Sequence, residues 1–446
     1  MSKVITRFPP SPTGKLHMGS ARTALFNFLF TKRHGGKMVL RMEDTDKERS
    51  RKEYEEDIIE GLSWLGISWE GDVWRQSERV EAYQKYLKEL LDKGLAYEAE
   101  ENKDKSGRVI RFKNPGGKVD FEDGLRGTIS VDVSDLKDFV IARSMSDPLY
   151  HLTVVVDDYE AGVTHIIRGE DGLANTPRQI LLQKALGFDT PAYTHIPFIL
   201  GQDKSKLSKR HGAKSVLEYK EAGYLPEAVV NFLAMLGWRS KKDGEKEIWS
   251  LEELIEEFSQ EGFQKSPAVF NEEKLRWINK QHLQTISDKD FWEALLDFAS
   301  NDLKEKLKAP GVKEALLEDL RERLSVYCDI EQMEKEGDFD WLLKDEPCLD
   351  AEELIWKKAD RKETLEHLKK LSEILCDPKV EGFGKERVEQ LVLPYAEEKG
   401  KGNVLWPLRY ALSGQKRSPS PFVLASALGQ NKTCKRINQA IEILGE

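Results

Sequence analysis

Short β-branched runs and longer helically spaced apolar runs alternate at the start of the chain. Val4–Phe8 predicts a strand, Ser20–His34 a helix with one apolar face, and Lys37–Met42 a second strand. The three prolines of Pro9–Gly14 predict a loop before the helix, because proline fits neither a strand ladder nor a helix interior. Strand, loop, helix and strand predict the beginning of a doubly wound α/β sheet, whose ligands bind at the C-terminal ends of the strands.

The pattern changes in the next segment and then returns. A helix at Tyr83–Leu91 is followed by the polar segment Glu98–Gly107, and Val109–Val140 consists of short strand-like runs broken by glycines. These elements predict a small α+β insertion. The apolar run Leu152–Val156 then predicts a parallel strand buried on both faces.

Two more strands and a long helical region complete the pattern. Strands are predicted at Thr164–Arg168 and His195–Leu200, separated by a helix at Asn175–Leu186. From about Leu225 onward the spacing is helical, and Pro310–Gly311 has the composition of a linker. The predicted helices that begin this region are Ala228–Trp238, Leu251–Phe258, Glu272–Ile278 and Asp290–Phe298.

Composition indicates a folded protein of several domains. The 446 residues correspond to about three domains at roughly 150 residues each. Hydrophobic residues make up 39% and charged residues 33%, which is typical of globular proteins. No stretch reaches the roughly 20 apolar residues of a membrane span, and the first residues lack the apolar core of an export signal. We therefore expect a cytoplasmic protein that does not enter a membrane.

Cysteine spacing and charge each suggest one expectation. The four cysteines lie far apart in sequence, so we expect reduced, packed thiols rather than a CxxC pair or a local zinc knuckle: Cys328, Cys348, Cys376 and Cys434. The net charge is −10, yet residues 401–446 hold seven basic and two acidic residues, a local surplus of +5. Such a surplus suits a surface that meets phosphate, and an ordinary solvated helix face is the alternative.

Two motifs are candidates for phosphate chemistry. His17–Ser20 stands where the first loop becomes the first helix, and a helix N-terminus attracts phosphate. Gly19 leaves room for a nucleotide, and His17 can donate to a phosphate oxygen. Lys206–Gly212 carries three cations within five residues after a strand, which suits a loop that clamps a polyphosphate. Taken alone, the first is better explained as an incidental histidine and the second as a solvated basic turn.

In this order, about 190 residues apart, the two motifs resemble the signature pair of class I aminoacyl-tRNA synthetases. The wider sequence resembles the bacterial glutamyl-tRNA synthetase family over nearly the whole chain. The segments that carry this resemblance are Arg7–Gly14, Ala21–Leu25, Arg41–Asp46, Val154–Asp158, Ile167–Asp171, Asn175–Gln179, Leu236–Trp238, Trp406–Arg409 and the Ser-Pro pairs at Ser418 and Ser420.

The resemblance implies the residues of the site. Those around L-glutamate would be Arg7, Ser11, Glu43, Tyr150 and Arg168. Arginine forks suit a carboxylate and a glutamate side chain suits the α-ammonium, although a buried arginine is also explained by a structural ion pair. The residues that contact ATP would be His17, Gly19, Asp171, Ile199, Lys206, Leu207, Ser208, Lys209 and Arg210. Within this set the catalytic residues would be His17, Gly19, Lys206 and Lys209, with Lys209 making the strongest transition-state contact.

The reaction implied by the resemblance needs no enzyme nucleophile. The glutamate carboxylate attacks the α-phosphorus of ATP, pyrophosphate leaves, and the terminal ribose hydroxyl of tRNA(Glu) then attacks the mixed anhydride. Catalysis consists of positioning and charge neutralisation, with Mg²⁺ carried largely on the phosphates. The resemblance leaves open whether tRNA(Gln) is charged as well and whether activation needs bound tRNA, and it implies a monomer.

The resemblance also implies the domain order. Residues 1–82 and 151–240 would form a Rossmann-type α/β catalytic domain, with 83–150 as an α+β insertion that holds the acceptor end of the tRNA. Residues 241–309 would form a helical stem-contact domain. The all-helical anticodon-binding domain would be 310–446, divided near 378, where Arg323 and Arg409 resemble arginines that read anticodon bases. An exposed arginine on a helical domain is, however, more often only a surface charge.

The sequence departs from the family pattern at two places. The first motif is His-Met-Gly-Ser instead of His-Ile-Gly-His, which keeps an apolar side chain and a hydroxyl, so activity is still expected. Many relatives carry a cysteine pair after the position of Tyr97, whereas this chain has Glu98 and Glu100. We therefore expect no zinc site and a shorter insertion.

Three other readings remain. A truncated paralogue that modifies a tRNA base would lack the helical C-terminal part that this chain has. A glutaminyl enzyme would have Glu-Pro-Asn in place of Ser11–Thr13 and a β-barrel anticodon domain. A non-catalytic tRNA-binding protein on the same scaffold would not need His17, Gly19, Lys206 and Lys209.

Overall fold

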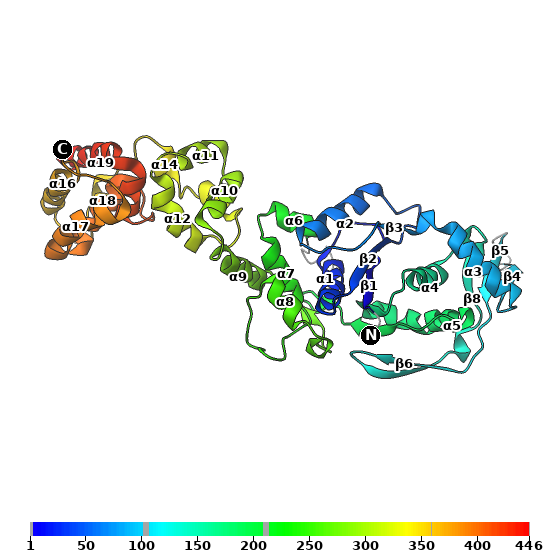
Figure 1. Cartoon of the computed structure of the whole chain (residues 1–446). Coiled ribbons are helices and arrows are strands. Elements are labelled where there is room, and N and C mark those ends of the chain that lie inside the picture. Colours follow the sequence, from blue (N-terminus) through cyan, green and yellow to red (C-terminus); the bar gives the residue numbers. More distant parts are fainter. Residues whose placement is uncertain (1–2, 101–106, 208–213, 358, 446) are drawn as a thin grey trace. The chain divides into compact units, whose positions relative to one another are not determined.

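The computed structural model describes residues 3–100, 107–207, 214–357 and 359–445, which form two compact units (Figure 1). The units are Met1–Asn279 and Lys280–Glu446. The first contains all the strands of the described residues and the second contains only helices, so the expected order of an α/β part followed by a helical part is confirmed. The division falls inside helix α9 (Glu272–Leu283). The finer boundaries at 83, 151, 241, 310 and 378 stay predictions.

The first unit is built on parallel strands. β1 (Ile5–Phe8), β2 (Lys37–Met42) and β3 (Trp74–Arg75) pair in parallel. β10 (His165–Gly169) and β11 (Ala192–Ile196) form a second parallel pair. The Thr164 N–H donates to the Ile5 carbonyl over 2.9 Å, so β10 runs beside β1. The C-terminal ends of these strands therefore meet at one edge.

The α+β insertion is attached to this sheet through one hairpin. β6 (Lys118–Asp123) and β7 (Gly127–Asp132) pair in antiparallel fashion. β6 also pairs with β11 through Asp123 and Tyr193, so the hairpin extends the parallel sheet. The remaining strands form a separate antiparallel sheet of β4 (Ala96–Glu100), β5 (Arg108–Phe112), β8 (Phe139–Ser144) and β9 (Asp147–Pro148).

The strand predicted at Leu152–Val156 is wrong, because these residues lie in helix α4 (Tyr150–Glu160). Leu152, Val154, Val155 and Val156 are all at most 2% exposed. A helix that is buried on all sides gives the same unbroken apolar run as a buried strand. The strand predicted at His195–Leu200 is interrupted after Ile196 by Pro197, and β12 (Ile199–Leu200) pairs with β13 (Ala268–Val269) instead.

The predicted helices of the first unit are present with slightly different ends. They are α1 (Met18–Arg33), α3 (Val80–Asp92), α5 (Thr176–Leu186), α7 (Pro226–Met235) and α8 (Leu251–Glu257), joined by α2 (Lys52–Trp64) and α6 (Val216–Glu221). Ser215 and Ser250 each form a capping box with a glutamate three residues on, and these boxes fix where α6 and α8 begin. Such caps explain why these two short helices start where they do.

The second unit is a stack of helices. They are α10 (Asp288–Phe298), α11 (Asn301–Leu307), α12 (Val312–Arg323), α13 (Asp329–Lys335), α14 (Asp340–Leu343), α15 (Ala351–Leu354), α16 (Arg361–Leu375), α17 (Lys385–Lys399), α18 (Lys401–Ser413) and α19 (Pro421–Gly445). α19 is interrupted at Gly429, where φ is 75°. Pro310–Gly311 forms the turn before α12, with Gly311 at φ 82°. None of the described helices is long and apolar enough to cross a membrane.

The expectation of four reduced cysteines is wrong for one pair. Cys376 at the end of α16 and Cys434 on α19 form a disulfide with their Cα atoms 5.7 Å apart. They are 58 residues apart in sequence, and spacing along the chain does not reveal which helices pack together. Cys328 and Cys348 are not part of a disulfide, and Cys348 is exposed.

Candidate active site

Two buried arginines stand at the edge where the parallel strands end. Arg7 on β1 is 1% exposed and Arg168 on β10 is 8% exposed. In each, Nη1 is buried and has no hydrogen-bond partner within the described part of the chain. An unpaired buried donor costs free energy, about 1–3 kcal/mol or more for a charged group. A carboxylate placed between the two would satisfy both and is the natural partner of guanidinium groups.

The other atoms of each guanidinium are held by the protein. Arg7 Nε lies 3.3 Å from an oxygen of Asp158. Arg168 donates from Nη2 to the Gly172 carbonyl over 3.1 Å and to Thr176 Oγ1 over 2.8 Å. Burial lowers the pKa of Arg168, and the positive charge of Arg7 contributes in the same direction. The two cations are therefore close enough to repel each other, which favours an anion near both.

Glu43 and Tyr150 lie at the same edge. Glu43, just after β2, accepts from Arg41 Nη2 over 3.2 Å. Burial raises its pKa, and Arg41 and Arg7 oppose this effect. Tyr150 is the first residue of α4, and its pKa is raised by burial and then by Glu43, against the effect of Arg168 and Arg7. The structure thus brings together Arg7, Glu43, Tyr150 and Arg168, four of the five residues expected around glutamate.

Ser11, the fifth residue expected around glutamate, has no side-chain hydrogen bond to the other four in the described structure. It is exposed in the loop after β1, and its carbonyl accepts from the Thr13 N–H over 2.8 Å. The Glu43 N–H donates to the neighbouring Pro10 carbonyl over 2.9 Å, so this loop is tied to the end of β2. A substrate contact by the Ser11 side chain stays a prediction.

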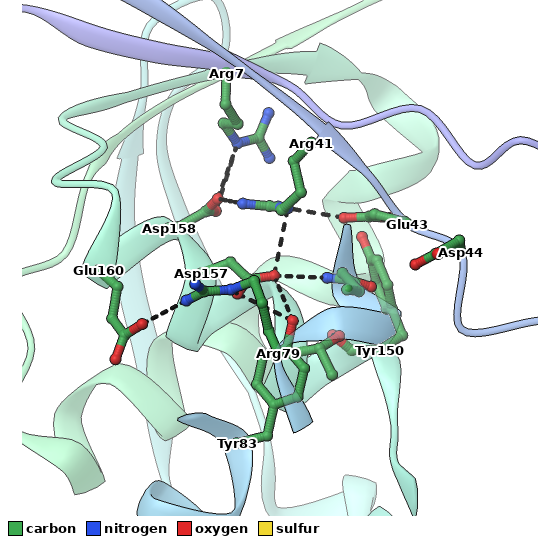
Figure 2. A network of polar contacts seen from close by, with 12 residues as sticks. Arg7, Arg41, Glu43, Asp44, Arg79, Tyr83, Tyr150, Asp157, Asp158 and Glu160 are labelled. Atoms are coloured by element: carbon green, nitrogen blue, oxygen red, sulfur yellow. Dashed lines mark hydrogen bonds and ion pairs between the residues drawn. The ribbon is translucent and has the colours of Figure 1, made fainter. Parts of the chain in front are cut away.

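A buried ion-pair network on α4 supports these residues (Figure 2). Asp158 is 2.7 Å from Arg41 Nη1 and 3.3 Å from Arg7 Nε. Burial would raise its pKa, but Arg7 and Arg41 more than offset burial and leave the pKa below its usual value. Asp157 accepts from Arg79 Nε over 2.8 Å and from the Tyr83 hydroxyl over 2.9 Å. Two adjacent carboxylates therefore hold the arginines of β1 and β2 and the start of α3.

The first motif forms the N-terminus of α1. His17 is the N-cap, and its Nδ1 accepts from the Ser20 N–H over 3.2 Å. The ring proton is then on Nε2, which lies 2.9 Å from Ser20 Oγ. A Cβ at Gly19 would come within 3.1 Å of the His17 ring, so glycine here keeps the ring close to the helix end.

The second motif begins beside the ends of β10 and β12. Lys206 Nζ lies 3.9 Å from Asp171 and 4.0 Å above the Phe198 ring. The Leu207 N–H donates to the Ile199 carbonyl over 2.9 Å. Asp171, Ile199, Lys206 and Leu207 are therefore neighbours, as expected. Ser208, Lys209 and Arg210 lie outside the described residues.

The segment after the second motif returns to the first. His17 and Ser215 form an isolated antiparallel bridge, and the Val216 N–H donates to the Leu16 carbonyl over 2.9 Å. Ser215 and Val216, which follow the second motif in sequence, therefore lie beside the start of α1. The described residues contain no group of three or more histidine, cysteine, aspartate or glutamate side chains that could hold a metal ion.

The basic residues expected to meet the anticodon have partners within the second unit. Arg323 is paired with Asp338 and Asp319. Arg409 donates to the Lys416 carbonyl over 3.0 Å and lies 4.7 Å above the Trp406 ring. The lysines that give residues 401–446 their positive surplus also form ion pairs, of Lys401 with Glu397, Lys416 with Glu353 and Lys435 with Glu346. Their role in binding RNA stays a prediction.

Sequence reasoning missed the residues that support the site. Asp158, Arg41, Asp123 and His195 are all buried and hold the predicted residues or one another. One signal was available, namely the two aspartates that directly follow the apolar run of α4. Aspartate in such a buried segment is almost always paired with a cation, so the pair of aspartates indicates an ion-pair network. The partners could not be named, since Arg41 and Asp158 are 117 positions apart.

Comparisons with known proteins agree with this arrangement. A family model described as the catalytic domain of class I tRNA synthetases (E and Q) matches residues 3–109 and 98–277, and an anticodon binding domain model matches 289–441. The glutamate–tRNA ligase of Aquifex aeolicus is 40% identical over 488 aligned residues, covering all of both chains. That of Thermodesulfovibrio yellowstonii is 39% identical, covering 98% of this chain and 99% of the relative.

Solved structures are similar over the same length. A glutamate tRNA ligase from Elizabethkingia meningosepticum, solved in complex with its amino acid, superposes with a TM-score of 0.85 at 32% identity. A glutamate-tRNA synthetase from Elizabethkingia anophelis gives 0.83 at 31% identity. Each comparison covers 99% of this chain and 100% of the other.

Proposed function

The chain belongs to the glutamate–tRNA ligase family of class I tRNA synthetases, and from this we propose that it activates L-glutamate with ATP and attaches it to tRNA(Glu). The observation that carries the proposal is the pair of buried, unpaired Nη1 groups of Arg7 and Arg168. Asp158, the carboxylate beside Arg7, is already paired with both Arg7 and Arg41. An acidic substrate supplies the missing acceptor.

Arg7 and Arg168 would bind the side-chain carboxylate of glutamate. A neutral amide has one accepting oxygen and an NH2 group that only donates, so glutamine would turn N–H groups toward a cation. The site would therefore favour glutamate through its attraction to the arginines and reject glutamine through the repulsion between its N–H groups and the same arginines. Glu43 and Tyr150, on the same edge, would bind the α-ammonium group, with Ser11 closing the site from its loop.

ATP would lie across the N-terminus of α1. The ring proton of His17 is on Nε2, so His17 can exchange its contact with Ser20 Oγ for a phosphate oxygen. Asp171 and Ile199 would contact the nucleoside, while Lys206, Leu207, Ser208, Lys209 and Arg210 would follow the phosphates. The glutamate carboxylate then attacks the α-phosphorus, pyrophosphate leaves, and charge on the phosphates is neutralised by His17 and the lysines.

Mg²⁺ would arrive bound to the phosphates of ATP. Magnesium sites of this kind use one or two carboxylates and substrate oxygens instead of an all-protein cage. The described residues contain no cluster of three or more histidine, cysteine, aspartate or glutamate side chains that would form such a cage. We propose that the insertion binds no zinc.

The tRNA would contact both units. Residues 83–150 would hold the acceptor end, 241–309 the stem, and 310–446 the anticodon, with Arg323 and Arg409 leaving their intramolecular partners to contact bases. The protein would act as a monomer. Attachment to tRNA(Glu) is the proposed reaction, and the assay below decides whether tRNA(Gln) is a second substrate.

The test is attachment of labelled glutamate to purified tRNA(Glu) and tRNA(Gln). Lys209→Ala is expected to lower kcat about 10²–10³-fold, by analogy with the loss of one oxyanion donor. Lys52→Ala, whose side chain is 88% exposed on α2, is the matched control and should keep full activity. Attachment to neither tRNA by an otherwise folded protein would contradict the proposal and favour a non-catalytic tRNA-binding role.

A further inference from the structure

A buried histidine contacts Arg168, and a buried aspartate contacts that histidine. Neither residue has a role in the proposed reaction. His195 on β11 is 0% exposed and Asp123 on β6 is 3% exposed. His195 Nδ1 is 2.7 Å from Asp123 Oδ2. Asp123 belongs to the inserted hairpin, whereas His195 belongs to the parallel sheet, and the two strands pair at this point.

The contacts of Asp123 determine which nitrogen of His195 carries the proton. Asp123 Oδ1 accepts from the backbone N–H groups of Leu125 and Arg126, over 3.0 and 2.9 Å. Oδ2 accepts from the His195 backbone N–H over 3.0 Å as well as from Nδ1. Since a carboxylate only accepts, the imidazole proton is on Nδ1 and Nε2 is an acceptor.

That acceptor faces the substrate arginine. Arg168 donates from Nε to His195 Nε2 over 3.1 Å. With Nη2 held by Gly172 and Thr176, two of the three nitrogens of Arg168 are fixed and only Nη1 is left without a partner in the described structure. A Cβ at Gly172 would come within 2.4 Å of Arg168 Nε, so the arginine is confined by packing as well.

We propose that Asp123 and His195 are positioning residues for glutamate binding, which hold Arg168 so that its Nη1 meets the substrate carboxylate. The proposal rests on the proposed function, in which Arg168 binds that carboxylate. Asp123 fixes the tautomer of His195, and His195 fixes the rotation of the guanidinium plane. The inserted hairpin thereby contributes a residue to amino-acid recognition although it does not touch the substrate.

Two histidine substitutions separate this role from simple packing. In His195→Asn the amide nitrogen replaces Nδ1 and keeps the contact with Asp123, but nothing reaches Arg168. In His195→Gln the longer side chain brings its carbonyl oxygen near the position of Nε2, where it accepts from Arg168. Positioning predicts that His195→Asn raises KM for glutamate about 10–100-fold, the effect of one hydrogen bond to a charged group. His195→Gln should stay within about 3-fold of the wild type.

Asp123→Asn tests the other residue of the pair. An amide has one accepting oxygen, so asparagine can serve either the two turn N–H groups or the two donors of His195, but not both. We expect a higher KM for glutamate, with KM for ATP nearly unchanged. Asp120→Asn, at an exposed position of the same strand, is the control and should behave as the wild type.

The experiment measures KM for glutamate and for ATP in tRNA(Glu) charging by the full-length protein, with melting temperatures to confirm folding. The expected result is a raised glutamate KM for His195→Asn and near-normal values for His195→Gln. Equal effects of the two histidine variants, or equal changes in both KM values, would overturn the proposal. If the wild type attaches no glutamate, the proposed function fails. If the wild type is active and His195→Asn is normal, only the positioning role fails.

Discussion

Asp158 is the residue that joins the two sides of the candidate site. It lies 2.7 Å from Arg41 Nη1, which in turn holds Glu43, and 3.3 Å from Arg7 Nε. Asp158→Asn would remove the negative charge that pairs with the buried guanidinium groups of Arg7 and Arg41. Removing one partner of a buried ion pair costs about 3–5 kcal/mol.

We therefore expect Asp158→Asn to lower the free energy of unfolding by about that amount and to raise KM for glutamate. Urea denaturation and charging kinetics measure the two effects. Asp189→Asn changes an exposed aspartate and serves as the control. A variant with normal stability and normal KM would show that Arg7 and Arg41 are held by other contacts.

His151 on α4 should make the first unit sensitive to acid. Burial, followed by Arg178 and Arg168, lowers its pKa from 6.5 to about 4. In the unfolded chain the ring takes up a proton near pH 6.5, whereas in the folded chain it does so only near 4. The contribution of this residue to stability is therefore complete above pH 6.5 and is lost as the pH falls from 6.5 toward 4, by up to about 3 kcal/mol.

His151→Gln should reduce the loss of stability between pH 6.5 and 4. Denaturant midpoints at pH 7.5, 5.5 and 4.5 measure it, with His34→Gln, at an exposed position, as the control. The same pH dependence in the wild type and in His151→Gln would contradict the assignment.

At the scale of single residues, the sequence could name ligand-binding candidates but not their supports. Arg7, Glu43, Tyr150 and Arg168 were predicted through resemblance, and the parallel strands bring them to one edge. Asp158 supports Arg41 from 117 positions away. Such a pair becomes visible only when the fold brings Asp158 of α4 to arginines of β1 and β2, because no local pattern connects these positions.

At the scale of elements, the sequence located most helices and strands but mistook one helix. The Leu152–Val156 run has no polar side to its helix, so the usual periodic signal is absent. The strand around His195 was predicted as one piece, although Pro197 cannot donate to a ladder and ends β11 at Ile196. Burial on several sides hides the helical pattern in the first case, whereas in the second the interruption comes from a proline that is visible in the sequence.

The disulfide between α16 and α19 should stabilise the second unit. It closes a loop of 58 residues, for which chain entropy predicts about 4 kcal/mol. We expect Cys376→Ser to lower the melting temperature of this unit under oxidising conditions and to have little effect in reductant. Cys348→Ser, at an exposed free thiol, is the control. A wild-type melting temperature that does not respond to reductant would contradict this expectation.

At the scale of the whole molecule, the sequence indicated an α/β part followed by helices, and the two compact units have this order. The expected linker at Pro310–Gly311 is a turn inside the second unit, since α11 and α12 on either side of it both belong to that unit. The positive surplus of residues 401–446 is partly neutralised by glutamates from α15 and α17 and by Glu346. Counting charges along the chain therefore overstated the basic surface of this segment.

If two buried arginines select an acidic amino acid for attachment to tRNA, the wild-type protein must discriminate glutamate from glutamine. This selectivity is measured as kcat/KM for attachment of each amino acid to tRNA(Glu). We expect a preference for glutamate of about 10⁴-fold, since glutamine leaves a buried charged donor unpaired. Use of glutamine within about 10-fold of glutamate, or no attachment of glutamate, would contradict it.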